Sequence, residues 1–204
     1  MPRDDRHAIK STILDAAAES FADAGFAGAR MQDIADRAGL PKPNLHYHFG
    51  TKKALYAAVL EEIVEKWLTA FDHIVPTADP AAALTAYIRQ KMADMRSQPI
   101  ASRVFASELL SGGTAIEDYL KGRLRNMVED KAEVIQGWID NGQMAPVDPF
   151  HLFFALWANT QTYADFAPQM SAVLGKQALD EADYRKAEDQ IIAMTLRGCG
   201  LEKG

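Results

Sequence analysis

Two polar residues near the start of a short predicted helix have the chemistry needed to read a nucleic acid. Lys42 carries a cation that can pair with a phosphate, and Asn44 carries an amide that can bond to a base edge. Pro41 and Pro43 flank Lys42, and proline is tolerated in a first helical turn because the N–H group it lacks would have no partner there. The opening of this helix is therefore a candidate DNA contact.

A second candidate site lies on the predicted helix 148–165. At roughly 100° per residue, Phe150, Phe154, Trp157 and Gln161 fall on one stripe, which places an amide along an aromatic face. A buried amide must find hydrogen-bond partners or cost about 1–3 kcal/mol. A pyrimidine-dione offers alternating N–H and C=O groups that an amide complements. Gln161 is thus either a satisfied core amide or part of a ligand site.

Lys91 stands on the apolar side of the predicted helix 80–96, near Leu84, Ile88 and Met95. A lysine in this position must reach solvent, pair with a carboxylate such as that of Glu108, or serve a pocket. Three aromatic residues are candidates either for stacking on a flat ligand or for ordinary core packing: Trp67, Phe105 and Trp157.

These residues do not form a recognisable catalytic set. The histidines are scattered at positions 7, 46, 48, 73 and 151, without a nucleophile triad, metal-ligand spacing or phosphate loop. His46 and His48 diverge on a helix and make a poor metal pair. Cys199 is the only cysteine, which excludes an internal disulfide. We expect no catalysis, metal or other cofactor; the alternative is a pyrimidine-acting enzyme in which Lys91, Asp165 or a histidine transfers protons.

The elements that must position these residues are all predicted to be helices. Glycine and proline interrupt helical periodicity along the chain, and alternating β-branched segments are absent. A first helix ends at Gly25, and Thr51 is the expected N-cap of a long helix that continues to the prolines at 76 and 80. The remaining helices are expected at 31–38, 41–50, 80–96, 100–111, 114–141, 148–165 and 177–197.

Charge is divided unevenly along the chain. The net charge of -6 argues against nucleic acid, but residues 1–53 hold 8 basic and 7 acidic residues, which leaves 14 basic and 21 acidic residues for the remainder. A small DNA-facing surface is therefore compatible with an acidic protein. No apolar run approaches the roughly 20 residues of a membrane span, and no signal peptide precedes the first helix, so we expect a cytoplasmic protein without membrane contact.

One series of residues extends in order across the first predicted helices: Gly25-Phe26, Ile34-Ala35, Ala38-Gly39-Leu40, Asn44 to Phe49, and Lys52 to Leu55. It resembles the N-terminal signature of the TetR family of transcriptional regulators. The resemblance implies a helix-turn-helix, with phosphate contacts from Tyr47, His48 and Lys52, while His46 either contacts a base or lies exposed. Arg30 is a further candidate phosphate ligand because Ala29 replaces a typical threonine, and Pro43 belongs to the same recognition segment.

The rest of the chain resembles a subgroup of that family. Residues 66–68 (KWL), 87–89 (YIR), 101–105 (ASRVF), 137–152 and 157–169 are similar to the pyrimidine-utilisation repressors, the RutR subgroup. This resemblance implies a small-molecule effector such as uracil or thymine, bound by Trp67, Lys91, Phe105, Trp157 and Gln161. A TetR-type repressor that answers a more apolar molecule is the alternative.

The last two long predicted helices carry apolar residues on more than one face, so they need two neighbours. The resemblance implies that the second neighbour is the other protomer of a homodimer with a four-helix interface. The candidate interface residues are Leu152, Leu156, Tyr163, Ile191 and Met194. We therefore predict an all-α chain with a DNA-binding domain at 1–54 and a ligand-binding and dimerisation domain at 55–204. As a dimer, it would bind palindromic operator DNA and release it when the effector binds.

Overall fold

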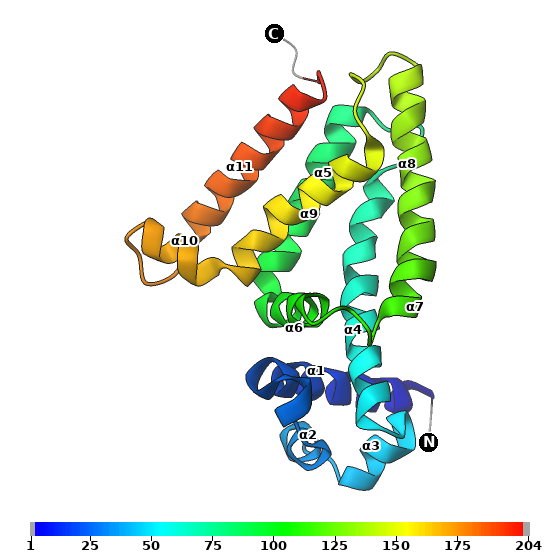
Figure 1. Ribbon diagram of the computed structural model, residues 1–204, viewed down its shortest axis with the longest axis vertical. Helices are drawn as coiled ribbons and strands as arrows, with labels where there is room; N and C mark the ends of the chain where they lie inside the picture. The colour runs from blue at the N-terminus through cyan, green and yellow to red at the C-terminus, as the bar shows by residue number, and fades with distance from the viewer. Residues whose placement is uncertain (1–2, 202–204) are drawn as a thin grey trace. The chain divides into compact units, whose positions relative to one another are not determined.

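The computed structural model describes residues 3–201, and these residues form helices joined by short loops (Figure 1). No strand occurs within that range, which confirms the all-α prediction. The chain folds into two compact units. The first comprises the residues up to Lys66 together with Ile100–Tyr119, and the second comprises Trp67–Pro99 and the residues from Leu120 onward.

The first unit contains α1 (Arg3–Gly28), α2 (Met31–Ala38), α3 (Lys42–Phe49), most of α4 (Lys52–Leu68), α6 (Pro99–Leu110) and α7 (Glu117–Tyr119). Its core is built from apolar side chains of these helices. The buried side chains include Ile13, Ala17, Phe21, Ile34, Ala35, Leu45 and Leu55. Because α2 and α3 each bury only one or two residues, the rest of their surface remains available for contacts.

The predicted end of the first helix at Gly25 is a break in the helical backbone. Gly25 has φ 66° and ψ 174°, and one further turn follows it to Gly28. A side chain at this positive φ would be strained, so glycine permits the break. Phe26 then turns back onto the unit, with its ring centroid 5.0 Å from that of Tyr56.

The second unit contains the 3₁₀ turn η1 (Thr69–His73), α5 (Pro80–Ser97), the π-helical turn η2 (Leu120–Leu124), α8 (Arg125–Asp140), α9 (Pro149–Asp165), α10 (Ala167–Val173) and α11 (Glu181–Gly198). In Figure 1, α5 lies beside α9 and α11, and α8 lies on the other side of α9. Phe71, Tyr87 and Phe153 form an aromatic core, with ring centroids 5.1–6.0 Å apart.

Acidic N-caps begin three long helices of the second unit, α5, α9 and α11. The Asp79 carboxylate accepts from Ala82 N at 2.9 Å, and that of Asp148 accepts from His151 N at 3.0 Å. Asp180 forms a reciprocal capping box with Asp183 at the start of α11. The other end of α11 is held by Cys199, which is 2% exposed and whose carbonyl accepts from Ala145 N at 2.8 Å.

The structure corrects three predicted boundaries. The segment 114–141 is not one helix, because it is interrupted by η2 around Gly122, a residue with a flexible backbone. The last helix begins at Glu181 and not at 177, since Asp180 caps it. The sequence prediction also missed α10, a short helix in which Pro168 occupies the tolerated first turn.

Candidate functional site

The turn between α2 and α3 fixes the candidate recognition helix. Gly39 adopts φ 65°, and its N–H group donates to the carbonyls of Ala35 and Asp36. This left-handed conformation ends α2 and redirects the chain into α3, and it requires a residue without a side-chain penalty. Leu45 is fully buried and anchors α3 from below.

Anchoring through Leu45 leaves the predicted contact residues at the surface of α3. Lys42, Pro43, His46 and Tyr47 are exposed, whereas Asn44 and His48 are half-buried. Tyr47 is 69% exposed, which is unusual for an aromatic residue and leaves its ring accessible to a ligand.

The two histidines of α3 differ in their contacts. The Nδ1 atom of His46 lies 2.8 Å from the carbonyl oxygen of Gly50, so this ring is held against the end of its own helix. The ring of His48 lies edge-on to that of Tyr47, with centroids 5.2 Å apart. His46 is exposed, and the prediction of a base contact stays open.

Arg30 lies exposed at the N-cap position of α2, where its backbone is extended and its side chain makes no cap hydrogen bond. Ala29 before it is 2% exposed and has no polar group to offer. Arg37 at the other end of α2 pairs with Glu19 at 3.0 Å and Asp23 at 2.8 Å, and the hydrogen bonds to Asp23 and Glu19 raise its pKa. Arg37 thus ties α2 to α1, while Arg30 stays available to an anion.

The side chain of Lys52, a predicted phosphate ligand, is directed to backbone carbonyls of its own chain. Its Nζ atom donates to the carbonyl oxygens of Phe26 at 2.7 Å, Ala29 at 3.0 Å and Ala27 at 3.4 Å. The predicted cap beside it is confirmed, because the Ala54 N–H group donates to Thr51 Oγ1 at 3.1 Å.

Lys91 is buried in the second unit, as its position on the apolar side of its helix predicts. The residue is 3% exposed, and its Nζ atom lies 4.6 Å from the centre of the Trp67 ring. Burial lowers the pKa of Lys91 to about 8, although the negative charges of Asp94 and Asp165 oppose this shift. A cation–π contact stabilises the ammonium form in this apolar surrounding.

Asp94 joins this cluster, and sequence reasoning missed it. One carboxylate oxygen accepts from Gln90 Nε2 at 2.9 Å, and the other is buried without a hydrogen-bond partner. Burial raises the pKa of Asp94, while Gln90 and Lys91 act in the opposite direction. Its spacing of three residues from Lys91 on one helix was the available signal, since such residues lie on the same face.

Trp157 and Gln161 occupy the margin of α9 and not its centre. The buried face of the helix consists of Phe153, Leu156, Thr160 and Ala164. Trp157 and Gln161 are half-buried, whereas the other members of the predicted stripe, Phe150 and Phe154, are 39% and 47% exposed. The aromatic stripe is therefore turned further toward solvent than its spacing suggested.

Trp157 is nevertheless held in place. Its Nε1–H group donates to the Tyr87 hydroxyl at 2.8 Å, which joins α9 to α5. Burial raises the pKa of Tyr87, so the phenol remains protonated. The second unit thus brings together Trp67 with Lys91 and, separately, Trp157 with Tyr87.

Phe105 and Glu108 belong to the first unit, on α6. Phe105 is 7% exposed. Glu108, the predicted alternative partner of Lys91, accepts from Ala115 N at 2.8 Å and is hydrogen-bonded to Tyr56. The carboxylate of Glu108 is therefore engaged within its own unit, and the acidic neighbour on the helix of Lys91 is Asp94.

The predicted interface residues on α9 and α11 fall into two groups. Leu152 and Tyr163 are half-buried and Met194 is 56% exposed, so each has surface for a partner. Leu156 and Ile191 are only 1% and 7% exposed, so they pack mainly within their own chain, and their assignment to the interface stays a prediction. A groove of about 310 Å³ runs between α9 and α11, past Leu152 and Met194.

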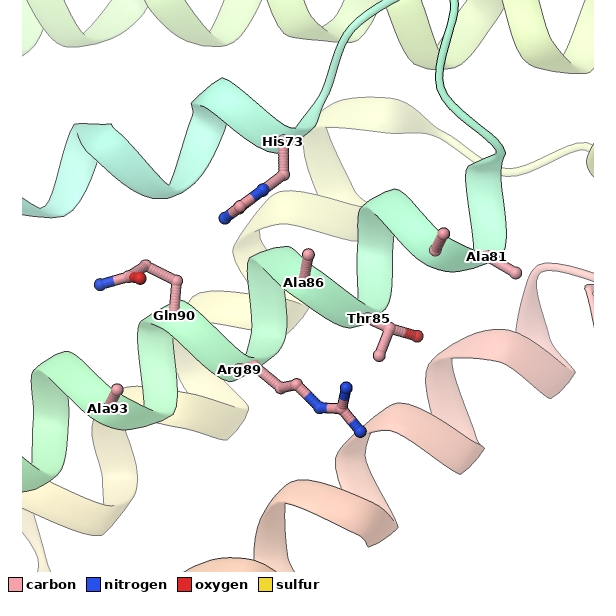
Figure 2. Close-up of a pocket in the computed structure, with 8 residues that line it drawn as sticks. His73, Ala81, Thr85, Ala86, Arg89, Gln90 and Ala93 are labelled. Atoms are coloured by element: carbon pink, nitrogen blue, oxygen red, sulfur yellow. The ribbon is translucent and has the colours of Figure 1, made fainter.

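A larger groove, of about 740 Å³, lies along α5 (Figure 2). Its floor consists of small residues such as Ala86 and Ala93, and His73 and Gln90 stand at its sides. Arg89 extends toward α11, where its Nε atom pairs with Glu188 at 3.3 Å. Lys91 does not line this groove, so the groove is separate from the predicted ligand residues.

The described part of the chain offers neither a membrane span nor a metal cluster. Between residues 3 and 201, no helix combines the length and apolar character that crossing a membrane requires. Within the same range, histidine, cysteine and acidic side chains do not gather in groups of three that could hold a metal ion.

Both parts of the chain match known protein families. Residues 13–59 match the bacterial regulatory proteins of the tetR family, and residues 60–202 match the C-terminal region of YcdC-like proteins. The HTH-type transcriptional regulators RutR of Escherichia coli strain K12 and of Shigella flexneri are each 41% identical to this chain over 191 residues, which covers 94% of this chain and 90% of theirs.

Solved structures share the fold at lower identity. PfmR, a TetR family transcriptional regulator from Thermus thermophilus, aligns with a TM-score of 0.71 and 20% identity, covering 94% of this chain and 99% of that one. A TetR-like transcriptional regulator from a Rhodococcus species aligns with a TM-score of 0.69 and 21% identity, covering 97% of both chains.

Proposed function

Because the chain belongs to the TetR family and is a helix-turn-helix transcriptional regulator rather than an enzyme, we propose that it is a ligand-released repressor. In this proposal a homodimer binds palindromic operator DNA, and a pyrimidine such as uracil or thymine weakens that binding. Two recognition helices must then match half-sites about 34–36 Å apart.

The DNA contacts of this proposal centre on α3 and the start of α2. Asn44 would bond to a base edge, and Lys42, Tyr47, His48 and Arg30 would contact phosphates. Pro43 and His46 would lie against the groove between them. The single observation that carries this proposal is the exposed polar surface of α3 above the buried Leu45, because a helix anchored in this way can enter a major groove without unfolding.

The effector contacts of this proposal combine a cation, a flat ring and an amide. Lys91 would donate to a pyrimidine carbonyl, Trp67 would stack on the ring, and Gln161 would pair with the N–H and C=O edge. Trp157 remains a candidate ring contact in the same unit, whereas Phe105 belongs to the first unit. The buried Lys91 and its contact with Trp67 support this assignment, since a buried charge is costly unless it serves a partner.

In this proposal the same ligand would alter the spacing between the recognition helices of the two protomers. A ligand that favours one protomer arrangement changes DNA affinity by its difference in affinity for the two arrangements, typically about 1–3 kcal/mol. The helix α4 is the candidate lever, because its first turn follows the recognition helix and its last turn carries Trp67.

A titration with labelled duplex tests this function. A duplex would be selected with the purified protein from a random-sequence library, and its affinity would be measured by fluorescence anisotropy with uracil, thymine, cytosine or no addition. We expect uracil or thymine to weaken binding by roughly 5- to 150-fold. Unchanged affinity at saturating uracil and thymine would reject the pyrimidine, and a thermal-shift screen with apolar compounds would then test the alternative effector.

A further inference from the structure

The ammonium group of Lys52 is surrounded by backbone carbonyls. Its Nζ atom lies 2.7 Å, 3.0 Å and 3.4 Å from the oxygens of Phe26, Ala29 and Ala27. An ammonium group has three N–H donors, so these carbonyls match its full donor capacity. The Nζ atom also lies 4.6 Å from the centre of the Phe26 ring, which adds a cation–π contact.

These carbonyls come directly after the break in the helical backbone at Gly25. They lie in the last turn of α1 and in the link to α2. Carbonyls at a helix end lack partners within the helix and carry partial negative charge, so a cation there is favourable. The carbonyl of Ala29 is also the one directly before Arg30, the N-cap residue of α2.

We propose that Lys52 is a positioning residue that holds the link between α1 and α2 against the start of α4, and that it thereby sets the position of Arg30 for DNA. Lys52 does not itself bind a phosphate, since doing so would leave three carbonyls without their charged donor. The proposal rests on the DNA-binding function above, and it identifies which of two roles, clamp or phosphate ligand, this basic side chain performs.

The salt dependence of DNA binding separates these two roles. Each phosphate contact that is lost makes the plot of log affinity against log salt shallower by about 0.9. The test compares Lys52→Met with Lys53→Met, a matched loss of charge at an exposed neighbour on the same helix. Affinity for the selected duplex and for a scrambled duplex would be measured over a range of salt concentrations, together with urea unfolding.

We expect Lys52→Met to bind the selected duplex about tenfold more weakly than Lys53→Met and to have a lower unfolding midpoint. Because a displaced Arg30 would itself lose a phosphate contact, the salt slopes are compared in chains that also carry Arg30→Met, where the clamp predicts the same slope for Lys52→Met and Lys53→Met. In that background, a slope shallower for Lys52→Met by about 0.9 would overturn the proposal in favour of a phosphate contact. Unchanged operator affinity with a lowered midpoint would also overturn it, because Lys52 would then serve stability alone.

A second variant keeps the test decisive if Lys52→Met does not fold. Lys52→Gln retains two N–H donors without the charge, so the clamp predicts an operator affinity and an unfolding midpoint below those of Lys53→Met. An operator affinity of Lys52→Gln equal to that of Lys53→Met would contradict the clamp. Wild-type protein that selects no duplex at all would instead reject the DNA-binding function, so the two failures are distinguishable.

Discussion

The ammonium group of Lys91 lies where little water reaches it. The residue is 3% exposed, and burial lowers its pKa to about 8, whereas the unfolded chain would titrate near the ordinary value of 10.5. Below pH 8 the folded and unfolded chains are both charged at this position, and the folded chain bears the cost of desolvation. Between about pH 8 and 10.5 the folded lysine becomes neutral first, so this cost is progressively removed.

This titration predicts a pH-dependent difference in stability between wild type and Lys91→Met. The unfolded state binds more protons than the folded state in that window, so the wild type gains stability relative to the variant as pH rises from about 8 to about 10.5, by about 1–3 kcal/mol. Urea unfolding of both proteins across this range measures the difference, with Lys53→Met as the exposed control. Parallel pH profiles would show that Lys91 is not desolvated.

Sequence reasoning reached some of these residues and not others. The place of Lys91 on an apolar helical face followed from helix periodicity, which left open whether its ammonium group reaches solvent, pairs or serves a pocket. The contacts of Lys52 could not be predicted in this way. Its three acceptors are backbone carbonyls 23–26 residues away, and the spacing of side chains carries no information about them. The family resemblance implied that Lys52 contacts a DNA phosphate, whereas in the structure its Nζ atom donates to backbone carbonyls.

At the scale of elements, α4 begins at a capped turn that joins the recognition helix to the rest of the chain. Thr51 Oγ1 accepts from Ala54 N at 3.1 Å, and the Thr51 carbonyl accepts from Leu55 N at 3.0 Å. Such a cap satisfies one of the free N–H groups at the helix start. The cap and the Lys52 clamp occupy consecutive residues, so this short segment fixes both the start of α4 and the end of α1.

Removal of the cap should lower the stability of the first unit. We expect Thr51→Ala to cost about 1 kcal/mol in the free energy of unfolding, whereas Thr51→Ser should cost much less because serine keeps the accepting oxygen. Chemical denaturation followed by circular dichroism measures both variants. Equal losses in Ala and Ser would mean that the methyl group, and not the hydroxyl, carries the effect.

Helix positions were largely predictable where capping and periodicity agree. The predicted helices at 31–38, 80–96, 100–111 and 148–165 correspond to α2, α5, α6 and α9 within one or two residues at each end. The π-helical turn η2 was not predictable, because Gly122 alone does not distinguish a helical irregularity from a continuous helix. The buried face of α9 was predicted wrongly for a similar reason. Apolar residues occur on several sides of this helix, so spacing alone did not identify the buried face.

At the scale of the whole molecule, the proposed dimer depends on apolar surface that a single chain leaves uncovered. Met194 on α11 is 56% exposed, and Leu152 on α9 lies beside the same groove. Exposed apolar groups at a groove between two helices suit a four-helix interface between copies of the chain.

Met194→Asp should therefore weaken self-association without unfolding the chain. A carboxylate in the interface centre is expected to cost about 2 kcal/mol or more of association free energy, and sedimentation velocity would register the shift from dimer to monomer. Leu110→Asp, at a site 86% exposed on α6, is the matched control and should leave association unchanged. A wild-type dimer that persists unchanged in Met194→Asp would place the interface elsewhere.

The buried thiol of Cys199, directly after α11, can report local opening of this end of the helix. Cys199 is the only cysteine, it is 2% exposed, and burial raises the pKa of its thiol. An alkylating reagent can therefore react at a single sulfur, and burial slows that reaction until the end of α11 opens locally. The alkylation rate in native buffer thus reports on the opening of this helix end without an added label.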